Sequence, residues 1–201
     1  MKKTQQGFTL VEMVIAMVIV GLLLGSVLKG QQLLVEAKVK SLEANFNSVA
    51  QAIYTYQERY HALPGDDANA NRFGLNISGG DGNGQIDGDY SSGTQESGLA
   101  WQHLRAARLV MGTPDDLMGP INAFGGKVGI GMDSTLMPWV FIGFTNIPDQ
   151  IGLLFEERLD GSTSSSPPDP QGGQVRAERG GILLTGNYKN DQELLNLLFA
   201  L

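Results

Sequence analysis

Residues 7–30 read GFTLVEMVIAMVIVGLLLGSVLKG, and this stretch is apolar along almost its whole length. Between Phe8 and Leu28 the only charged side chain is Glu12. At 1.5 Å per residue, a helix of this stretch is roughly 30 Å long, which matches the hydrocarbon core of a bilayer. We therefore expect a membrane-spanning helix that carries one carboxylate close to its start.

Two lysines before this stretch predict its orientation. Lys2 and Lys3 should hold the N-terminus in the cytoplasm, so that the rest of the chain lies on the other side. A secretory signal peptide would end in a cleavage site of small residues, which residues 28–30 do not provide. An uncleaved signal anchor explains the length but not Glu12, because a carboxylate within a membrane is costly and rarely lacks a partner.

The composition of the chain narrows the function classes. The chain has 201 residues, of which 42% are hydrophobic, so it can form one globular domain with appendages. Its formal charge of -7 disfavours nucleic-acid binding, which depends on Lys and Arg neutralising phosphates. It contains no cysteine, which excludes disulfides, thiolate metal ligands and cysteine nucleophiles.

The N-terminus resembles that of a known family. Lys2-Lys3 followed by GFTLVE, residues 7–12, is similar to the signature of type IV pilins and type II secretion pseudopilins. In that family a prepilin peptidase cuts after the glycine and N-methylates the new first residue. The resemblance implies cleavage after Gly7, a discarded leader of residues 1–7, and methylation of Phe8. It also implies an inner-membrane protein whose head is periplasmic and which then enters a periplasmic or extracellular filament.

The resemblance implies an assembly role for Glu12. In the mature chain Glu12 would pair with the cationic amine of a neighbouring subunit, so that a buried acid gains its partner on assembly. Gly21 and Gly25 either allow close helix packing or weaken the helix by about 1 kcal/mol each relative to Ala. The implied partners are homologous pilin or pseudopilin subunits, the prepilin peptidase and an inner-membrane assembly platform.

After the membrane and assembly helix, residues 8–34, the pattern changes to that of an amphipathic helix over residues 35–64. This helix packs either on the protein's own sheet, which we favour, or in a coiled-coil dimer. Pro64-Gly65-Asp66 should end it at about Leu63. Apolar residues recur at steps of three and four: Val35, Val39, Leu42, Phe46, Val49, Ile53, Tyr56, Tyr60 and Leu63.

The remaining residues, 65–201, should form a globular head. Residues 65–98 are rich in Gly and Asp and predict a long loop, residues 120–189 predict an antiparallel sheet, and the apolar tail 190–201 should dock on the head. The expected strands cover residues 127–132, 138–144, 151–156 and 181–184. The fold class is therefore α+β and pilin-like, with a long N-terminal helix packed on a small antiparallel β-sheet.

The run DGNGQIDGD, residues 81–89, is a candidate calcium site because calcium binds six to eight oxygen ligands on flexible backbone. The resemblance to an EF-hand or dockerin loop fails at Ile86 and Ser92. Glu96 is a further candidate, and the alternative is an Asn/Asp/Gly turn without metal. Major pseudopilins as a family use structural calcium. The predicted ligands are Asp81, Asn83, Gln85, Asp87 and Asp89.

No catalytic motif stands out, and we expect no enzyme. His61 and His103 are the only histidines and lie too far apart in sequence to predict a zinc site. The predicted function is a structural subunit of a type IV pilus-like or type II secretion pseudopilus filament, and the sequence does not separate the two. The alternative is a membrane-anchored, calcium-dependent binding protein that does not polymerise.

Overall fold

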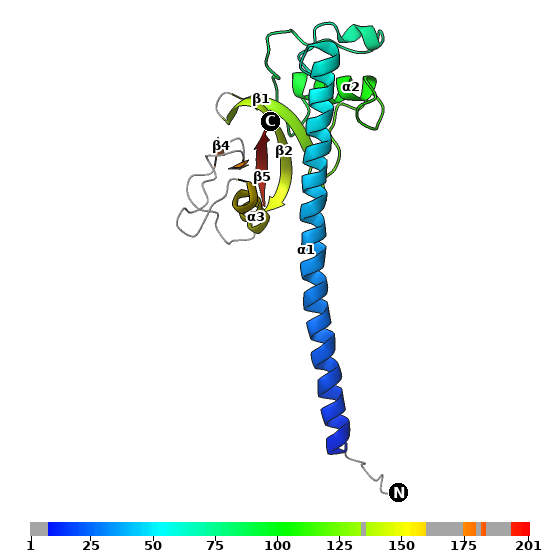
Figure 1. Ribbon diagram of the computed structural model, residues 1–201, viewed down its shortest axis with the longest axis vertical. Coiled ribbons are helices and arrows are strands. Elements are labelled where there is room, and N and C mark those ends of the chain that lie inside the picture. Colours follow the sequence, from blue (N-terminus) through cyan, green and yellow to red (C-terminus); the bar gives the residue numbers. More distant parts are fainter. Residues whose placement is uncertain (1–7, 134–135, 160–174, 180–181, 184–193) are drawn as a thin grey trace, which may run out of the picture. The chain divides into compact units, whose positions relative to one another are not determined.

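The computed structural model describes residues 8–133, 136–159, 175–179, 182–183 and 194–201. The chain divides into two compact units, residues 1–40 and residues 41–201. The predicted leader 1–7, which includes Lys2, Lys3 and Gly7, lies outside the described residues. Figure 1 gives the order of the elements along the chain.

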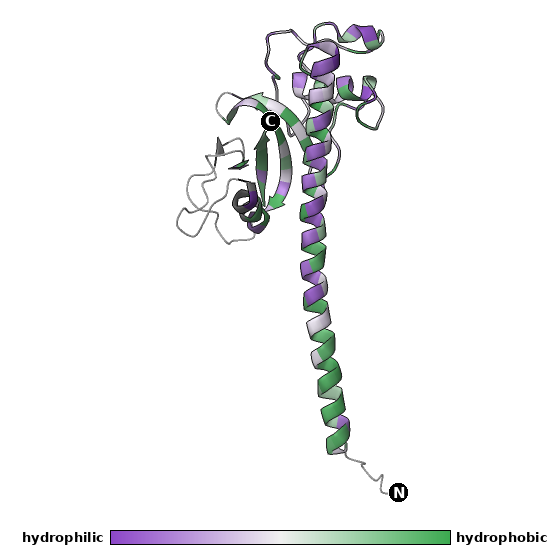
Figure 2. Cartoon of the chain, in the orientation of Figure 1, coloured by the Kyte–Doolittle hydropathy of each residue, from purple (hydrophilic) through white to green (hydrophobic). Residues whose placement is uncertain are grey.

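The first element is α1, Leu10–Tyr60, a single helix of 51 residues that contributes to both units. It contains no proline, and its N-terminal half is almost wholly hydrophobic whereas its C-terminal half mixes hydrophobic and hydrophilic residues (Figure 2). It ends at Tyr60, slightly before the expected position, because His61 adopts a left-handed φ of 53°. The His61 N–H donates to the Gln57 carbonyl at 2.9 Å, which closes the last turn.

The amphipathic half of α1 is packed within the second unit. Its buried side chains are spaced as the sequence predicts for one helix face, and they include Leu42, Val49, Ile53 and Tyr56. The ring centroids of Phe46 and Phe199 lie 5.3 Å apart, and Phe199 is a residue of the sheet. This helix face therefore packs on the protein's own sheet.

Within the described residues the sheet has five strands, all antiparallel, in the order β1-β2-β5-β3-β4. The fold class predicted from the sequence, α+β with a long N-terminal helix and a small antiparallel sheet, is confirmed. The strands are β1 Val128–Asp133, β2 Met137–Pro148, β3 Val175–Arg179, β4 Ile182–Leu183 and β5 Leu194–Ala200.

The C-terminal segment forms a strand within the sheet and does not simply dock on it. β5 lies between β2 and β3, with Phe141 opposite Ala200 and Val175 opposite Phe199. The Phe199 ring contacts Phe144 of β2 at 5.4 Å and Phe155 at 5.3 Å. Phe199 thus joins the sheet to two helices, which explains why this segment is apolar.

The predicted strand 151–156 is wrong, because these residues belong to α3, Asp149–Leu159. Ile151 and Phe155 are both buried, whereas Leu154 is 37% exposed. Gly152, next to Ile151, is buried as well, so burial does not alternate along the segment as it would in a strand with one buried face. The Ser-, Pro- and Gly-rich loop predicted at 162–173 lies outside the described residues.

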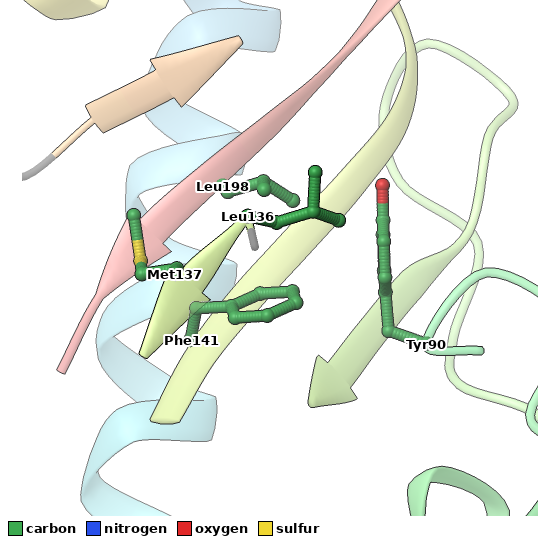
Figure 3. Packing of buried hydrophobic residues seen from close by; sticks show 5 residues of the cluster. All are labelled: Tyr90, Leu136, Met137, Phe141 and Leu198. Carbon is green, nitrogen blue, oxygen red and sulfur yellow. The ribbon is translucent and has the colours of Figure 1, made fainter. Parts of the chain in front are cut away.

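A gap in one face of the sheet accommodates Tyr90. Gly129 of β1 pairs directly with Gly143 of β2, so neither strand presents a side chain at this point. The Tyr90 ring fills the space, and a Cβ on Gly143 would lie 2.4 Å from its Cε2. Figure 3 shows the surrounding packed residues: Tyr90, Leu136, Met137, Phe141 and Leu198.

Between α1 and the sheet the chain forms loops with two short helices. These helices are η1, Ala70–Phe73, and α2, Gln95–Ala106, which follows Thr94 in extended conformation. Trp101 of α2 is fully buried. Most of the buried side chains of α2 are nevertheless polar, and they determine the geometry of the loops.

Candidate functional site

The start of α1 carries a local arrangement that involves Glu12. Thr9 precedes the first residue of the helix, and its N–H and hydroxyl donate to Glu12 Oε2 at 2.9 and 2.8 Å. The Glu12 N–H donates in return to Thr9 Oγ1 at 3.3 Å. Thr9 and Glu12 therefore form a capping box, which satisfies backbone donors at the helix start and places a negative charge at the positive end of the helix dipole.

The capping box was not anticipated from the sequence, although T-L-V-E, residues 9–12, has the required spacing. It gives Glu12 a structural role within its own chain. Only Oε2 takes part, and Oε1 accepts no hydrogen bond from the described residues. Glu12 thus retains one carboxylate oxygen that is available to a group from another molecule.

The residues that follow are exposed over the whole apolar half of α1. Phe8 is 84% exposed, and large aliphatic side chains from Leu10 to Leu34 are all exposed. Within the described part of the chain, α1 is the one helix that is long and apolar enough to cross a membrane. So large an exposed apolar surface requires a cover of lipid or of other helices.

A second candidate site lies in the head, where three carboxylates converge. Asp66, Asp81 and Glu96 each offer an oxygen, and these oxygens lie within 4.8 Å of one another. Asp66 follows the end of α1, Asp81 lies in the Gly- and Asp-rich loop, and Glu96 is in the first turn of α2. The site therefore joins three segments that are distant in sequence.

Backbone donors hold two of these carboxylates in place. Glu96 accepts the N–H of Asp81 at 2.9 Å with Oε1 and the N–H of Asp87 at 3.1 Å with Oε2. Asp66 Oδ2 accepts the N–H of Gly84 at 2.9 Å. Asp66 Oδ1 is buried and has no hydrogen-bond partner in the described part of the chain. No ion pair found among the described residues includes any of the three carboxylates.

Other polar side chains of α2 hold further loop segments. Gln102 Oε1 accepts the N–H of Ser78 at 3.1 Å. Arg105 donates to the carbonyls of Met111, Asp116 and Met118, the last at 2.7 Å. Since these loops lack regular backbone pairing, the buried polar side chains of α2 supply the missing hydrogen-bond partners.

His103 holds the loop at two points and is fully buried. Its Nδ1 accepts the N–H of Gly65 at 2.9 Å, so Nδ1 carries no proton and Nε2 donates to the Ser78 carbonyl at 2.7 Å. Burial lowers the pKa of His103, opposed by the bond to Ser78 and by the charge of Asp67, with Arg72 adding to the decrease. The ring stacks on Tyr56. The folded head therefore requires the neutral imidazole.

We expect stability to fall as the pH drops from about 7.5 to about 5.5. The unfolded histidine takes up a proton near its ordinary pKa of about 6.5, whereas the folded one resists protonation, so unfolding becomes more favourable below that pH. Fluorescence of Trp101 and Trp139, both in the head, would give the melting temperature of the full chain in detergent. The decrease should be largely lost in His103→Gln and kept in His61→Gln, which changes the exposed histidine. An equal decrease in all three proteins would refute the role of His103.

The structure places the metal ligands predicted from the sequence in different surroundings. Asp81 belongs to the carboxylate cluster. Its carboxylate accepts hydrogen bonds from the Asn83 N–H and from the Asn83 side-chain amide, both at 3.0 Å. Gln85 and Asp87 are exposed. Asp89 accepts hydrogen bonds from Ser91 and Ser92, and these bonds together lower its pKa although burial, the largest single effect, raises it. The ligand set remains a prediction.

Asp66 was not among the candidates from the sequence, and Glu96 was named only as an addition. Asp66 lies 15 residues before Asp81, and Glu96 lies 15 residues after it. No local motif connects positions so far apart. The one signal was positional, because Asp66 follows the Pro64-Gly65 helix stop and Glu96 opens the next helix.

These features define the structural class of the protein. The chain has the α+β, pilin-like layout, with an exposed apolar N-terminal helix and a head on a small antiparallel sheet. Residues 2–28 match the family described as the prokaryotic N-terminal methylation motif, which is the signature of type IV pilins and pseudopilins. No curated protein and no solved structure shows significant similarity to the chain. The motif supports a pilin or pseudopilin precursor that is processed by prepilin peptidase, and the apolar helix fits a membrane-anchored protein.

Proposed function

We propose that this protein is a structural subunit of a type IV pilus-like or type II secretion pseudopilus filament. It is cleaved after Gly7, methylated on Phe8 and assembled through α1 from the inner membrane, with its head in the periplasm. The observation that carries this proposal is the methylation motif at residues 2–28, which overlaps the apolar, exposed half of α1. Other subunits of the same kind would cover that half once it leaves the membrane.

Two glycines of α1 support this interpretation. A Cβ on Gly21 or Gly25 would meet nothing within 4 Å in the described chain, so nothing there requires their small size. In a bundle of α1 helices these positions would allow close approach of the helix backbones. The need for glycine would then come from the neighbouring subunits.

Glu12 is the residue on which the assembly mechanism depends, and the capping box supplies a competing explanation for it. If Glu12 pairs with the methylated amine of a neighbour, its charge is essential. If Glu12 only caps its own helix, a neutral side chain of the same length suffices, because Gln serves equally in a capping box. The charge and the cap can therefore be separated by substitution.

We expect both Glu12→Ala and Glu12→Gln to reduce incorporation into sheared filaments strongly, because both remove the charge. Thr9→Ala breaks the cap but keeps the carboxylate, and should assemble nearly normally. The amount of chain in the filament fraction and in the membrane fraction, measured by immunoblot in a host with the assembly machinery, tests this. Mass spectrometry of each variant should show cleavage after Gly7 and one added methyl group, so that processing is controlled.

Two results would contradict the proposal. Normal assembly of Glu12→Gln together with poor assembly of Glu12→Ala would leave Glu12 with a capping role only. A wild-type chain that is processed and stays in the membrane fraction would favour an anchored binding protein that does not polymerise. Neither result would contradict the proposed membrane helix or the proposed cleavage after Gly7.

A further inference from the structure

We propose that Asp66, Asp81 and Glu96 bind one calcium ion, and that this ion fixes the long loop of the head. This site differs from the run 81–89, because only Asp81 belongs to both. Its other two ligands come from the segment after α1 and from the first turn of α2.

The spacing of the oxygens suits calcium. Two oxygens bound to the same calcium ion at 2.3–2.6 Å lie at most about 4.6–5.2 Å apart. The three carboxylate oxygens lie within 4.8 Å of one another, so one ion can reach all of them without a large movement of the backbone. Asp81 is exposed, which leaves room for water to complete the six to eight ligands that calcium takes.

The buried member of the cluster points independently to a ligand. Asp66 is only 6% exposed, and its Oδ1 is buried without a hydrogen-bond partner among the described residues. A buried carboxylate oxygen without a partner costs free energy, and two further carboxylates close by add repulsion. A cation would remove both costs, since it binds the free oxygen and compensates the shared negative charge.

The position of the site explains what the ion would do for the head. Between Gly74 and Thr94 the described chain forms no helix or strand, and the loop is held by side chains of α2. A calcium ion would tie the loop to α2 and to the end of α1 at one point. This is the constraint that a disulfide would give, in a chain that contains no cysteine.

The test uses the full-length protein in detergent, stripped of metal with a chelator and titrated with calcium chloride in a calorimeter. We expect one site with a Kd of about 10⁻⁴–10⁻³ M, as for other exposed calcium sites outside the cytosol. About 5 mM calcium should raise the melting temperature, followed by tryptophan fluorescence, by roughly 5 °C. Asp66→Asn and Asp81→Asn should each weaken calcium binding roughly tenfold or more.

One control separates loss of metal binding from loss of fold. With chelator present, Asp66→Asn should melt no lower than the wild type, because it removes repulsion and places an amide donor beside the other carboxylates. Asp89→Asn changes an acid that the cluster does not include and should bind calcium as the wild type does. Absence of binding heat and of a melting shift at about 5 mM calcium would overturn the proposal. Binding that survives Asp66→Asn and is lost in Asp89→Asn would also overturn it, in favour of the run 81–89.

Discussion

Replacing Asp67 with alanine is expected to lower the free energy of unfolding of the head by about 3 kcal/mol. The Asp67 carboxylate is 2% exposed, and it accepts the Tyr56 hydroxyl at 2.6 Å and the Asn69 N–H at 2.9 Å. It also pairs with Arg72, whose side chain is one-third exposed and can return to water. The main cost in the variant is therefore the buried Tyr56 hydroxyl, left without an acceptor.

Two variants divide this effect into its parts. Tyr56→Phe removes one hydrogen bond together with its donor and should cost about 1 kcal/mol. Asp67→Asn keeps an acceptor for Tyr56 but loses the attraction for Arg72. Its loss of unfolding free energy should therefore lie between those of the other two variants. Urea unfolding followed by tryptophan fluorescence measures all three. A cost for Asp67→Ala no larger than that of Tyr56→Phe would show that the carboxylate does not organise this region.

Gly143→Ala is the second substitution with a large expected effect, and should cost about 3 kcal/mol. The new methyl group would lie 2.4 and 2.5 Å from two carbons of the Tyr90 ring and 3.3 Å from a methyl of Leu198. The ring has little freedom to move, because its hydroxyl donates to Glu178 and its own backbone lies against Gly129. Either the ring leaves its place or the strands separate.

A matched glycine tests whether the clash is the cause. Gly125 has a φ of 82°, and a Cβ there would meet only the Asn146 side chain at 4.0 Å. Gly125→Ala should therefore show the backbone cost alone, about 1 kcal/mol. In a background of Tyr90→Ala, Gly143→Ala should cost much less than in the wild type. Equal costs in the two backgrounds would mean that Tyr90 is not what the glycine accommodates.

The long helix could be predicted from the sequence because its signals are local. The apolar run after Phe8, the three- and four-residue steps from Leu42 to Tyr56, and the absence of proline each act over a few turns. The strands β1 and β2 were likewise found from nearby residues, since they form a hairpin. Nearby residues do not show which other strand a given strand pairs with.

The elements that were missed depend on distant contacts. β5 reads as an apolar segment that could be a helix or a strand, and only its place between β2 and β3 makes it a strand. β3 carries two arginines and a glutamate among five residues, and its burial comes from that pairing. α3 was interpreted as a strand because a short apolar run does not distinguish the two periods.

The same distinction applies to the candidate sites. The predicted cleavage and methylation site lies in a continuous motif, and residues 2–28 match the N-terminal methylation family. The carboxylate cluster is discontinuous, since Asp66, Asp81 and Glu96 meet only after the loop folds over α2. Sequence reasoning therefore selected the densest run of oxygen-bearing residues and missed the buried Asp66.

The central place of β5 has a consequence for the order of folding. The β1–β2 and β3–β4 hairpins can each close from neighbouring residues, but they have no pairing with each other until residues 194–200 enter between them. Until then β2 and β3 each present an open edge, and such edges recruit foreign strands. Completion of the sheet is thus a long-range event that depends on the last residues of the described chain. A short extended peptide that mimics β5 should therefore compete for this gap during refolding.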